Sequence, residues 1–346
     1  MKIVIAPDSY KGCLTAREVA AAAAAGIRAS CPGMETVCMP VADGGEGTVD
    51  ALMACLGGSI VTAAVTDPLG RPIDAEYGIC GDLAVIECAS ACGLTLLKKE
   101  ERNPLFATTR GLGEMIVDAK ARGCSRFIIG LGGSATNDGG RGMIETPGLM
   151  EAAAGSRFTV ACDVDTPYIG PKGASRTFGP QKGATPKDIE ILESRLCTYA
   201  SRILEETGVD VRDLPGAGAA GGLGGAFHAF LHADLLPGAE IVLDAANFDA
   251  VLENADLVIT GEGCSDFQTP MGKVPVAVLK RAASKGVPVV LMSGSICHCQ
   301  ELDGMGFAAM ETVTPEGMPL SEAMAYETAM ANIKSAAGRI IRTFKD

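Results

Sequence analysis

The chain contains no tryptophan and few other aromatic residues, with five tyrosines and ten phenylalanines in 346 residues. Flat platforms on which nucleobases could stack are therefore scarce. Positive charge is also in short supply, because 29 lysines and arginines face 42 aspartates and glutamates and leave a net charge of −13. An acidic protein repels phosphate backbones and anionic lipids, so we expect neither nucleic acid nor a membrane surface as its partner.

Long apolar runs and secretion signals are missing as well. No apolar run approaches the roughly 20 residues that a transmembrane helix needs. The N-terminal sequence MKIVIAPDSYKG reaches a Pro-Asp pair after six residues and contains no signal-peptide core. The thirteen cysteines are scattered and odd in number, which favours reduced thiols over a disulfide framework. We therefore expect a cytoplasmic protein.

Two common nucleotide-binding signatures are absent or lie in the wrong context. No G-x-x-x-x-G-K-[ST] string occurs, because Val274 follows Lys273, and this excludes a P-loop NTPase. A G-x-G-x-x-G string occupies residues 216–221, but residues 211–215 before it lack strand character. A dinucleotide-dependent oxidoreductase is therefore only an alternative.

The candidate metal-binding clusters in the sequence are incomplete. His228 and His232 have the spacing of one helical face, and Cys297-His298-Cys299 brings three potential ligands together. Neither is accompanied by a second ligand pair or a carboxylate motif at zinc spacing, so packing or incidental roles are favoured. Asp163-Val164-Asp165 resembles the aspartate pair of phosphoaspartate phosphatases, although only in two residues.

Glycine, by contrast, is abundant, and the most informative stretch of the chain is residues 127–143, FIIGLGGSATNDGGRGM. An apolar run long enough only for a buried strand opens into a loop with six glycines between Gly130 and Gly142. Glycine lets backbone N–H groups approach a ligand closely, because no Cβ holds the ligand away. In an open α/β sheet such a loop lies at the carboxyl end of its strand, where ligands bind.

The two ends of the chain share one pattern of apolar and helical segments, and the middle of the chain has a different pattern. Before residue 60 and after about 240, short apolar segments alternate with helical ones, which predicts a parallel sheet with crossover helices. The predicted strands there include residues 2–6, 37–40, 241–243, 257–259 and 287–292. Residues 59–97 are rich in Val, Ile and Thr and interrupted by turn residues, which favours hairpins.

Helix signals complete the expected architecture. Thr15 with Glu18 fits a capping box, and Thr185-Pro186 should begin the longest helix, which Gly208 should end. Further helices are expected at residues 108–122, 273–285 and 321–344. We predict an α/β fold: a doubly wound, Rossmann-like parallel-sheet domain of residues 1–60 and 240–346, with a mixed α/β domain of residues 61–239 inserted into it. We expect the active site in the cleft between them.

Acidic side chains recur where the predicted strands end, and four cations occupy similar loops. Each carboxylate alone is most often a turn former or helix cap, but carboxylates gathered at one sheet edge suit Mg²⁺ and phosphate. The carboxylates are Asp8, Asp43, Asp138, Asp163, Asp165, Glu262 and Asp266, and the cations are Lys11, Arg141, Lys182 and Lys273. These loops by themselves suggest a phosphoryl transferase without a P-loop.

Eight loop sequences, in order along nearly the whole chain, closely resemble the bacterial glycerate kinases of the type that forms 2-phosphoglycerate. They are APDSYKGCLTAREVA, PVADGGEGT, VTDPLGRP, NPLFATTRGLGE, IGLGGSATNDGGRGM, FGPQKGA, PGAGAAGGLGG and VITGEGCSDFQTPMGKVP. The resemblance implies ATP and Mg²⁺ as co-substrates, D-glycerate as acceptor, and two α/β domains. No nucleic acid or membrane partner is implied, and a homodimer stays open.

The resemblance also implies a set of site residues. We hypothesise that Asp43 or Asp266 is the base, with Lys11 and Lys273 stabilising charge on the transferred phosphoryl group. Asp163 and Asp266 are the expected metal ligands. The expected binding residues are Asp8, Ser9, Gly44, Glu46, Gly132, Gly133, Ser134, Asn137, Asp138, Gln181, Lys182 and Glu262.

Two departures from the family pattern bear on activity. The segment 144–156 is shorter than in most members, so a strand or lid piece of the middle domain could be missing. Cys264 stands where the family usually has Arg, and a thiol cannot bind a carboxylate or phosphate bidentately. The alternatives are therefore a kinase of another small hydroxy acid or a non-catalytic binding homologue, besides the oxidoreductase.

Overall fold

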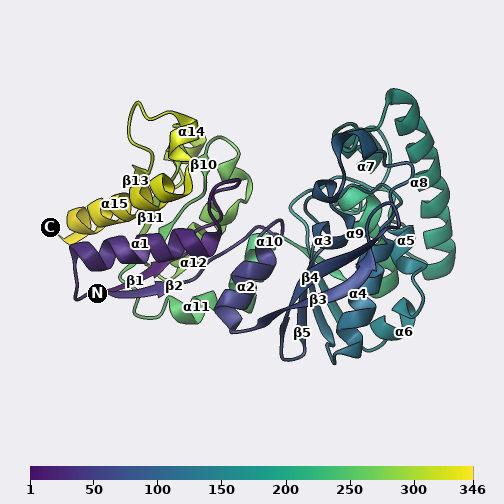
Figure 1. The fold of residues 1–346 in the computed structure, drawn as a ribbon, viewed down its shortest axis with the longest axis horizontal. Helices are drawn as coiled ribbons and strands as arrows, with labels where there is room; N and C mark the ends of the chain where they lie inside the picture. Colours follow the sequence, from purple (N-terminus) through teal and green to yellow (C-terminus); the bar gives the residue numbers. More distant parts are fainter. Residues whose placement is uncertain (346) are drawn as a thin grey trace. The chain divides into compact units, whose positions relative to one another are not determined.

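The computed structural model describes residues 1–345 and divides into two compact units (Figure 1). The terminal unit contains Met1–Asp43, Asp50–Leu56 and Val242–Asp346, and the middle unit contains Gly44–Val49 and Gly57–Ile241. Both are α/β, as predicted. The cleft between two domains, proposed from the sequence as the active site, stays a prediction.

The terminal unit is built on a five-stranded, fully parallel sheet in the order β13-β11-β9-β1-β2. Renumbered along the chain, this is the doubly wound order 2-1-3-4-5, whose direction of winding reverses between β1 and β9. Such a switch point opens a crevice at the carboxyl ends of the two strands. The strands are β1 (Lys2–Ile5), β2 (Glu35–Cys38), β9 (Leu257–Thr260), β11 (Val289–Ser293) and β13 (Ala309–Thr312).

Helices cover both faces of this sheet. One face carries α1 (Ala16–Ser30) and α15 (Tyr326–Lys345), which pack side by side (Figure 1). Gly26 makes this possible, because a Cβ there would collide with the backbone of Lys334. The predicted capping box of Thr15 and Glu18 begins α1. On the other face, α12 (Val274–Ser284) packs on β9 and β11.

The smaller elements of the terminal unit lie mostly in its loops. They are α2 (Thr48–Leu56, of which Thr48 and Val49 belong to the middle unit), α11 (Phe248–Val251), β10 (Cys264–Ser265), β12 (Ser295–Ile296), α13 (Gln300–Asp303) and α14 (Leu320–Ala323). The predicted closing helix is thus divided into α14 and α15. The predicted strand at residues 241–243 is wrong, because these residues lie inside helix α10 (Gly238–Ala245). A short apolar run does not distinguish a buried strand from a buried helix.

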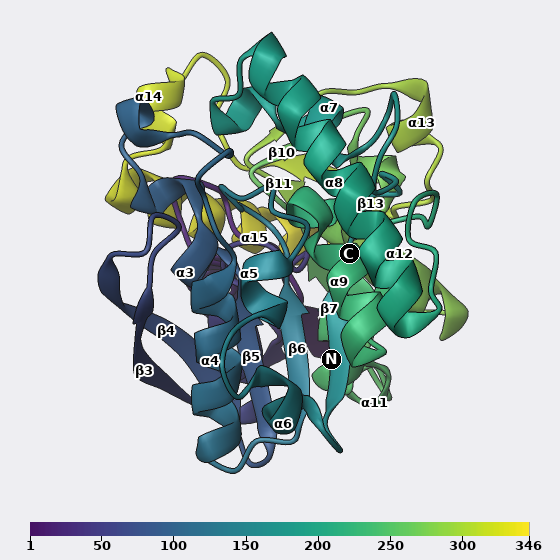
Figure 2. The ribbon, with the colours of Figure 1, turned by 90° about the vertical axis from the view of Figure 1, so that its right-hand side faces the viewer.

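The middle unit contains a mixed six-stranded sheet in the order β3-β4-β5-β6-β7-β8 (Figure 2). Its first three strands are antiparallel neighbours, as the hairpin pattern predicted, and β5 to β8 are parallel. The carboxyl ends of β5, β6 and β7 therefore meet at one edge. The strands are β3 (Ser59–Thr66), β4 (Pro72–Cys80), β5 (Leu83–Glu87), β6 (Arg126–Gly130), β7 (Arg157–Ala161) and β8 (Asp234–Leu236).

The core of the middle unit joins this sheet to its helices. Phe127 of β6 stacks on Phe158 of β7 with ring centroids 4.6 Å apart, and Phe158 meets Phe227 of α9 (Ala219–Leu231). The longest helix, α8 (Pro186–Thr207), has the predicted caps at Thr185 and Gly208. The other helices are α3 (Ala89–Cys92), α4 (Arg110–Ala121), α5 (Arg141–Ile144), α6 (Leu149–Ala153) and α7 (Ala174–Phe178).

The glycine-rich segment 215–225 does not form a dinucleotide-binding turn. Residues 220–222 of α9 have left-handed backbone conformations, and a Cβ at Gly221 would collide with the backbone of Thr136. Its glycines therefore let α9 approach the loop after β6. His232 is the left-handed cap that ends α9, so it does not continue a helical face with His228.

Within residues 1–345, none of the helices combines the length and the apolar character needed to cross a membrane. All thirteen cysteines are free thiols.

Candidate active site

A cavity of about 470 Å³ opens in the terminal unit at the carboxyl ends of β1 and β9, where the sheet winding reverses. The loops after β1, β2 and β9 supply its charged residues, together with Lys273 at the start of α12. Seven residues predicted as site residues line this one cavity: Asp8, Ser9, Lys11, Asp43, Glu262, Asp266 and Lys273. The switch point thus brings together residues more than 250 positions apart in the sequence.

The loop after β1 holds a carboxylate in an unfavourable setting. Asp8 is buried and close to Asp43, and burial together with that neighbouring charge raises the pKa of Asp8 to about 7. Its Oδ1 accepts a hydrogen bond from the backbone N–H of Ser9 at 2.6 Å. Lys11 Nζ lies 3.3 Å from Asp43 Oδ2. Burial lowers the pKa of Lys11, but Asp43 and Asp8 more than offset this and raise it.

The loop after β9 presents a carboxylate whose oxygens are fully engaged. Glu262 Oε1 accepts hydrogen bonds from Ser265 Oγ at 3.1 Å and Thr269 Oγ1 at 2.7 Å. Its Oε2 lies 3.2 Å from Lys273 Nζ, which is also 3.9 Å from Asp266 Oδ1. Lys273 is the N-cap residue of α12. A cation there opposes the helix dipole, so its two carboxylate neighbours hold it in place.

The glycine-rich loop after β6 belongs to the middle unit. Gly132 and Gly133 are exposed, and Gly133 has a left-handed backbone. Ser134 and Asn137 are buried, and Asn137 donates a hydrogen bond from Nδ2 to Ser175 Oγ at 3.0 Å. The Oδ1 atom of Asn137 is buried without a hydrogen-bond donor in the part of the chain that the structure describes.

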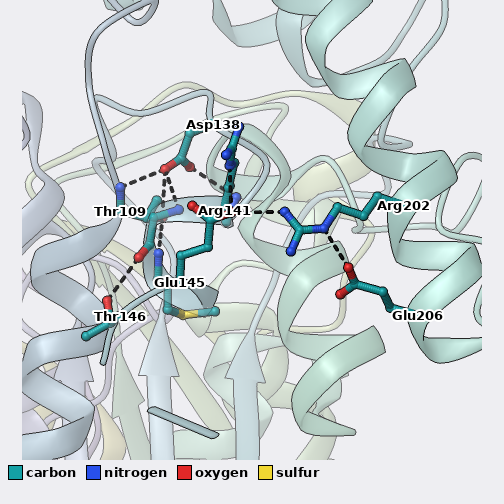
Figure 3. A network of polar contacts seen from close by, with 10 residues as sticks. Thr109, Asp138, Arg141, Glu145, Thr146, Arg202 and Glu206 are labelled. Carbon is teal, nitrogen blue, oxygen red and sulfur yellow. Dashed lines mark hydrogen bonds and ion pairs between the residues drawn. The ribbon is translucent and has the colours of Figure 1, made fainter. Parts of the chain in front are cut away.

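Asp138, by contrast, is an anchor of the fold (Figure 3). Its Oδ2 accepts hydrogen bonds from the N–H and hydroxyl of Thr109, both at 2.9 Å, and from Gly142 N at 3.1 Å. Its Oδ1 accepts from Gly140 N at 3.0 Å. Burial raises the pKa of Asp138 in spite of these donors. The predicted cation Arg141 pairs with Glu145 instead.

The remaining predicted residues lie elsewhere in the middle unit. Gly44 has a left-handed backbone, and a Cβ there would collide with Ala161 of β7. Glu46 and Gln181 are exposed. Asp163, after β7, accepts a hydrogen bond on Oδ1 from the backbone N–H of Gly238 at 2.9 Å. The metal-binding prediction for Asp163 and Asp266 stays a prediction. No group of three or more potential metal ligands gathers within residues 1–345.

Two residues that the sequence reasoning missed belong with these loops. Glu87, at the end of β5, accepts a hydrogen bond from Val49 N at 2.9 Å in the first turn of α2, and burial raises its pKa. Its position at a strand end is the signal that singled out the other acids. Arg102 donates from Nη2 to Leu94 O at 3.4 Å, and its Nε is buried without an acceptor among the described residues.

Arg102 is placed beside the loop after β6 through its neighbours. Leu94 N donates to Gly133 O, and the backbone of Arg102 packs against Gly183, next to Lys182. In residues 1–345, no carboxylate pairs with Arg102. Arg102 directly precedes the segment NPLFATTRGLGE, and no spacing rule singles it out in the sequence.

Comparison with known proteins decides the family. A family model described as the glycerate kinase family matches residues 3–152 and 144–345. The chain belongs to the glycerate kinase family. A glycerate kinase from Bacillus subtilis (strain 168) is 44% identical over 93% of both chains. A protein named glycerate 2-kinase from Escherichia coli (strain K12) is 47% identical over 86% of both chains. The prediction of a glycerate kinase is confirmed, and the oxidoreductase and non-catalytic alternatives fall away.

Structure comparison agrees with this assignment. A crystal structure of a protein described as a glycerate kinase 2 from Salmonella typhimurium LT2 matches with a TM-score of 0.89 and 42% identity. The match covers all of this chain and 98% of the other. The predicted fold class is thereby confirmed.

The segment 144–156, which we expect to be shorter than in most members, includes the residues where the two family-model matches overlap. The two parts matched by the family model overlap at residues 144–152. The alignment with a glycerate kinase from Bacillus cereus (strain ATCC 10987 / NRS 248) covers all of this chain in 376 positions, so that relative has residues without a counterpart here. In the structure, β7 follows this segment and pairs with both β6 and β8.

Proposed function

We propose that the protein transfers the γ-phosphoryl group of ATP to the 2-hydroxyl of D-glycerate, producing ADP and 2-phosphoglycerate in the cytoplasm. The observation that carries the proposal is the cavity at the switch point, where Lys11 and Lys273 lie among four carboxylates. Lysines in a low-dielectric cavity stabilise the charge of a phosphoryl group during transfer. The name of the E. coli relative supports the choice of hydroxyl.

In the reaction, the substrate oxygen forms a bond to the γ-phosphorus as the bond from that phosphorus to the ADP oxygen breaks. The proton of the attacking hydroxyl passes to a carboxylate. We favour Asp43 for this role, because it lines the cavity and its Oδ2 lies 3.3 Å from Lys11 Nζ, the cation that we expect to stabilise the transferred group. Asp266, 3.9 Å from Lys273, is the alternative.

The donor set of the cavity fits a divalent cation. Asp8, Asp43, Glu262 and Asp266 all line the cavity, and the charges of Asp43 and Glu262 add to the effect of burial in raising the pKa of Asp8. Mg²⁺ needs only one or two protein carboxylates when phosphates complete its shell. Asp266 would hold it, since Glu262 is already engaged by Ser265, Thr269 and Lys273. When bound, the ion neutralises charge on the phosphate oxygens.

Arg102 is linked to the glycine-rich loop after β6 through Leu94, whose carbonyl accepts from Arg102 Nη2 and whose N–H donates to Gly133 O. A guanidinium binds a carboxylate through two parallel hydrogen bonds. We assign the carboxylate of D-glycerate to Arg102.

The experiment that tests this function follows ADP release with and without D-glycerate and identifies the product by NMR. Asp43→Asn and Asp266→Asn should each lower kcat by at least about a hundredfold while the protein stays folded. Near-normal turnover in both would reject the assignment of the base. ADP release that does not depend on D-glycerate would reject the acceptor.

Cys264 favours a second candidate, a kinase of another small hydroxy acid. It lines the cavity at a position where the resemblance leads one to expect arginine. A panel of two- to four-carbon hydroxy acids in the same assay distinguishes the two. A kcat/KM higher for another acid than for D-glycerate would favour the second candidate.

A further inference from the structure

We propose that the cavity of the terminal unit binds the whole nucleotide, with the base at an apolar end formed by α14 and the first part of α15. The proposal rests on the proposed function in one respect, that ATP is the phosphoryl donor. It adds the elements that would recognise the adenosine part of ATP. None of the site residues predicted from the sequence lies in these elements.

The residues that line the cavity form two chemically different sets, which we call its charged end and its apolar end. The charged end consists of residues from the loops after β1, β2 and β9, together with Lys273, as described above. The other end comes from the end of β13, from α14 and from the first two turns of α15. Its apolar lining residues are Val313, Leu320, Ala323, Met324, Ala329 and Ile333. A ligand that fills both ends must carry negative charge at one end and apolar surface at the other.

The volume of the cavity also favours a nucleotide as its ligand. About 470 Å³ lies within the range of roughly 300–1,000 Å³ that is typical of pockets for cofactors and drug-sized molecules. A three-carbon hydroxy acid is far smaller and has almost no apolar surface to bury. A nucleoside triphosphate matches both the volume and the separation into an anionic and an apolar part.

Two side chains at the apolar end remain exposed. Leu320 is 73% exposed and Met324 is 39% exposed, although both line the cavity. Binding of a ligand that covers exposed apolar side chains is favourable, because it removes their apolar surface from water. Methionine is also well suited to contact a flat ring, because its thioether is polarisable and its chain is flexible.

Polar groups are available at this end for the edge of a base. Thr314 and Asn332 line the cavity beside the apolar residues. The Asn332 amide lies 3.5 Å from Met318 Sδ, which is a weak acceptor, so it can exchange this contact for a ring nitrogen or an exocyclic group. Apolar walls with a few placed polar groups are the usual composition of a small-molecule site.

The test compares ligands with and without a base. Dissociation constants for ATP and for inorganic tripolyphosphate are measured by calorimetry on the full chain. The variants are Leu320→Asn and Met324→Asn, separately and together. Met150→Asn is the matched control, because Met150 is 46% exposed on α6 of the middle unit. All three positions are exposed, so folding should be preserved, and the unfolding midpoint checks this.

We expect the double variant to bind ATP at least tenfold more weakly, with tripolyphosphate changed less than twofold and the control unchanged. The KM for D-glycerate should stay the same. In the unmodified protein, photolabelling with 8-azido-ATP should attach to a peptide within residues 313–333. Unchanged ATP binding, equal weakening of both ligands, or labelling elsewhere would overturn the proposal. If the unmodified protein neither binds ATP nor releases ADP, the proposed function itself fails.

Discussion

The ammonium group of Lys182 lies 2.9 Å from the hydroxyl of Ser134 and 2.7 Å from the carbonyl oxygen of Thr136. Lys182 is buried, and in residues 1–345 no carboxylate forms an ion pair with it. Burial lowers its pKa to about 8. The lysine therefore holds the loop after β6 in place through two hydrogen bonds. Its ammonium charge is poorly solvated there, which is unfavourable for the charged form.

This burial predicts a pH dependence of stability. The unfolded chain keeps Lys182 protonated up to about pH 10.5, while the folded protein releases the proton near pH 8. Between these values the unfolded state binds more protons, so the free energy of unfolding should rise with pH, by at most about 1.4 kcal/mol per unit. Lys182→Met should remove this rise in urea unfolding between pH 8 and 10.5.

The control for Lys182 is Lys120→Met, since Lys120 is half-buried and also donates to a serine hydroxyl, that of Ser156. It should keep the pH dependence of the unmodified protein. The same slope in the Lys182 variant and the unmodified protein would show that Lys182 stays charged throughout.

Asp138 should matter for stability more than for binding. Asp138→Asn removes the charge that four donors share and turns one acceptor into a donor facing an N–H group. We expect the free energy of unfolding to fall by about 2–4 kcal/mol. Urea unfolding measures this, and the exposed Asp213→Asn should change it by less than about 0.5 kcal/mol. A raised KM for D-glycerate at unchanged stability would instead make Asp138 a binding residue.

Lys273 should be needed for turnover. Its ammonium group is held by Glu262 and Asp266 at the wall of the cavity, where a transferred phosphoryl group would lie. Lys273→Met should lower kcat by about a hundredfold to a thousandfold, and Lys273→Arg should restore part of it. Lys285→Met, at the other end of α12, is the control and should keep kcat. Loss of activity in that control would point to the helix rather than the charge.

Arg102 should affect the acceptor and not the nucleotide. Arg102→Lys keeps the charge but loses the planar pair of donors, so the KM for D-glycerate should rise by about tenfold to a hundredfold. The KM for ATP should stay within twofold. Initial rates with each substrate varied in turn measure both constants. A rise confined to the KM for ATP would place a phosphate, rather than the carboxylate, at Arg102.

Much of the chain could be predicted from the order of its residues. The alternation of apolar strands with capped helices indicated the parallel sheet, and Thr15, Thr185 and Gly208 set helix ends correctly because capping acts between near neighbours. The glycine-rich loops indicated both the strand ends and the family. Local signals failed at residues 241–243, where three apolar residues fit a strand but lie in α10.

The roles of individual side chains depended on the tertiary structure. Asp8 and Asp138 follow the same local pattern, yet Asp8 lines a cavity beside other carboxylates while Asp138 is saturated by four donors. Lys182 and Lys273 each stand next to a glycine in the sequence, but of the two only Lys273 lines the cavity. The sequence determined which groups stand at strand ends, since that follows from local periodicity. Only folding decided which were buried, paired or left facing a ligand, because those properties depend on neighbours supplied by distant segments.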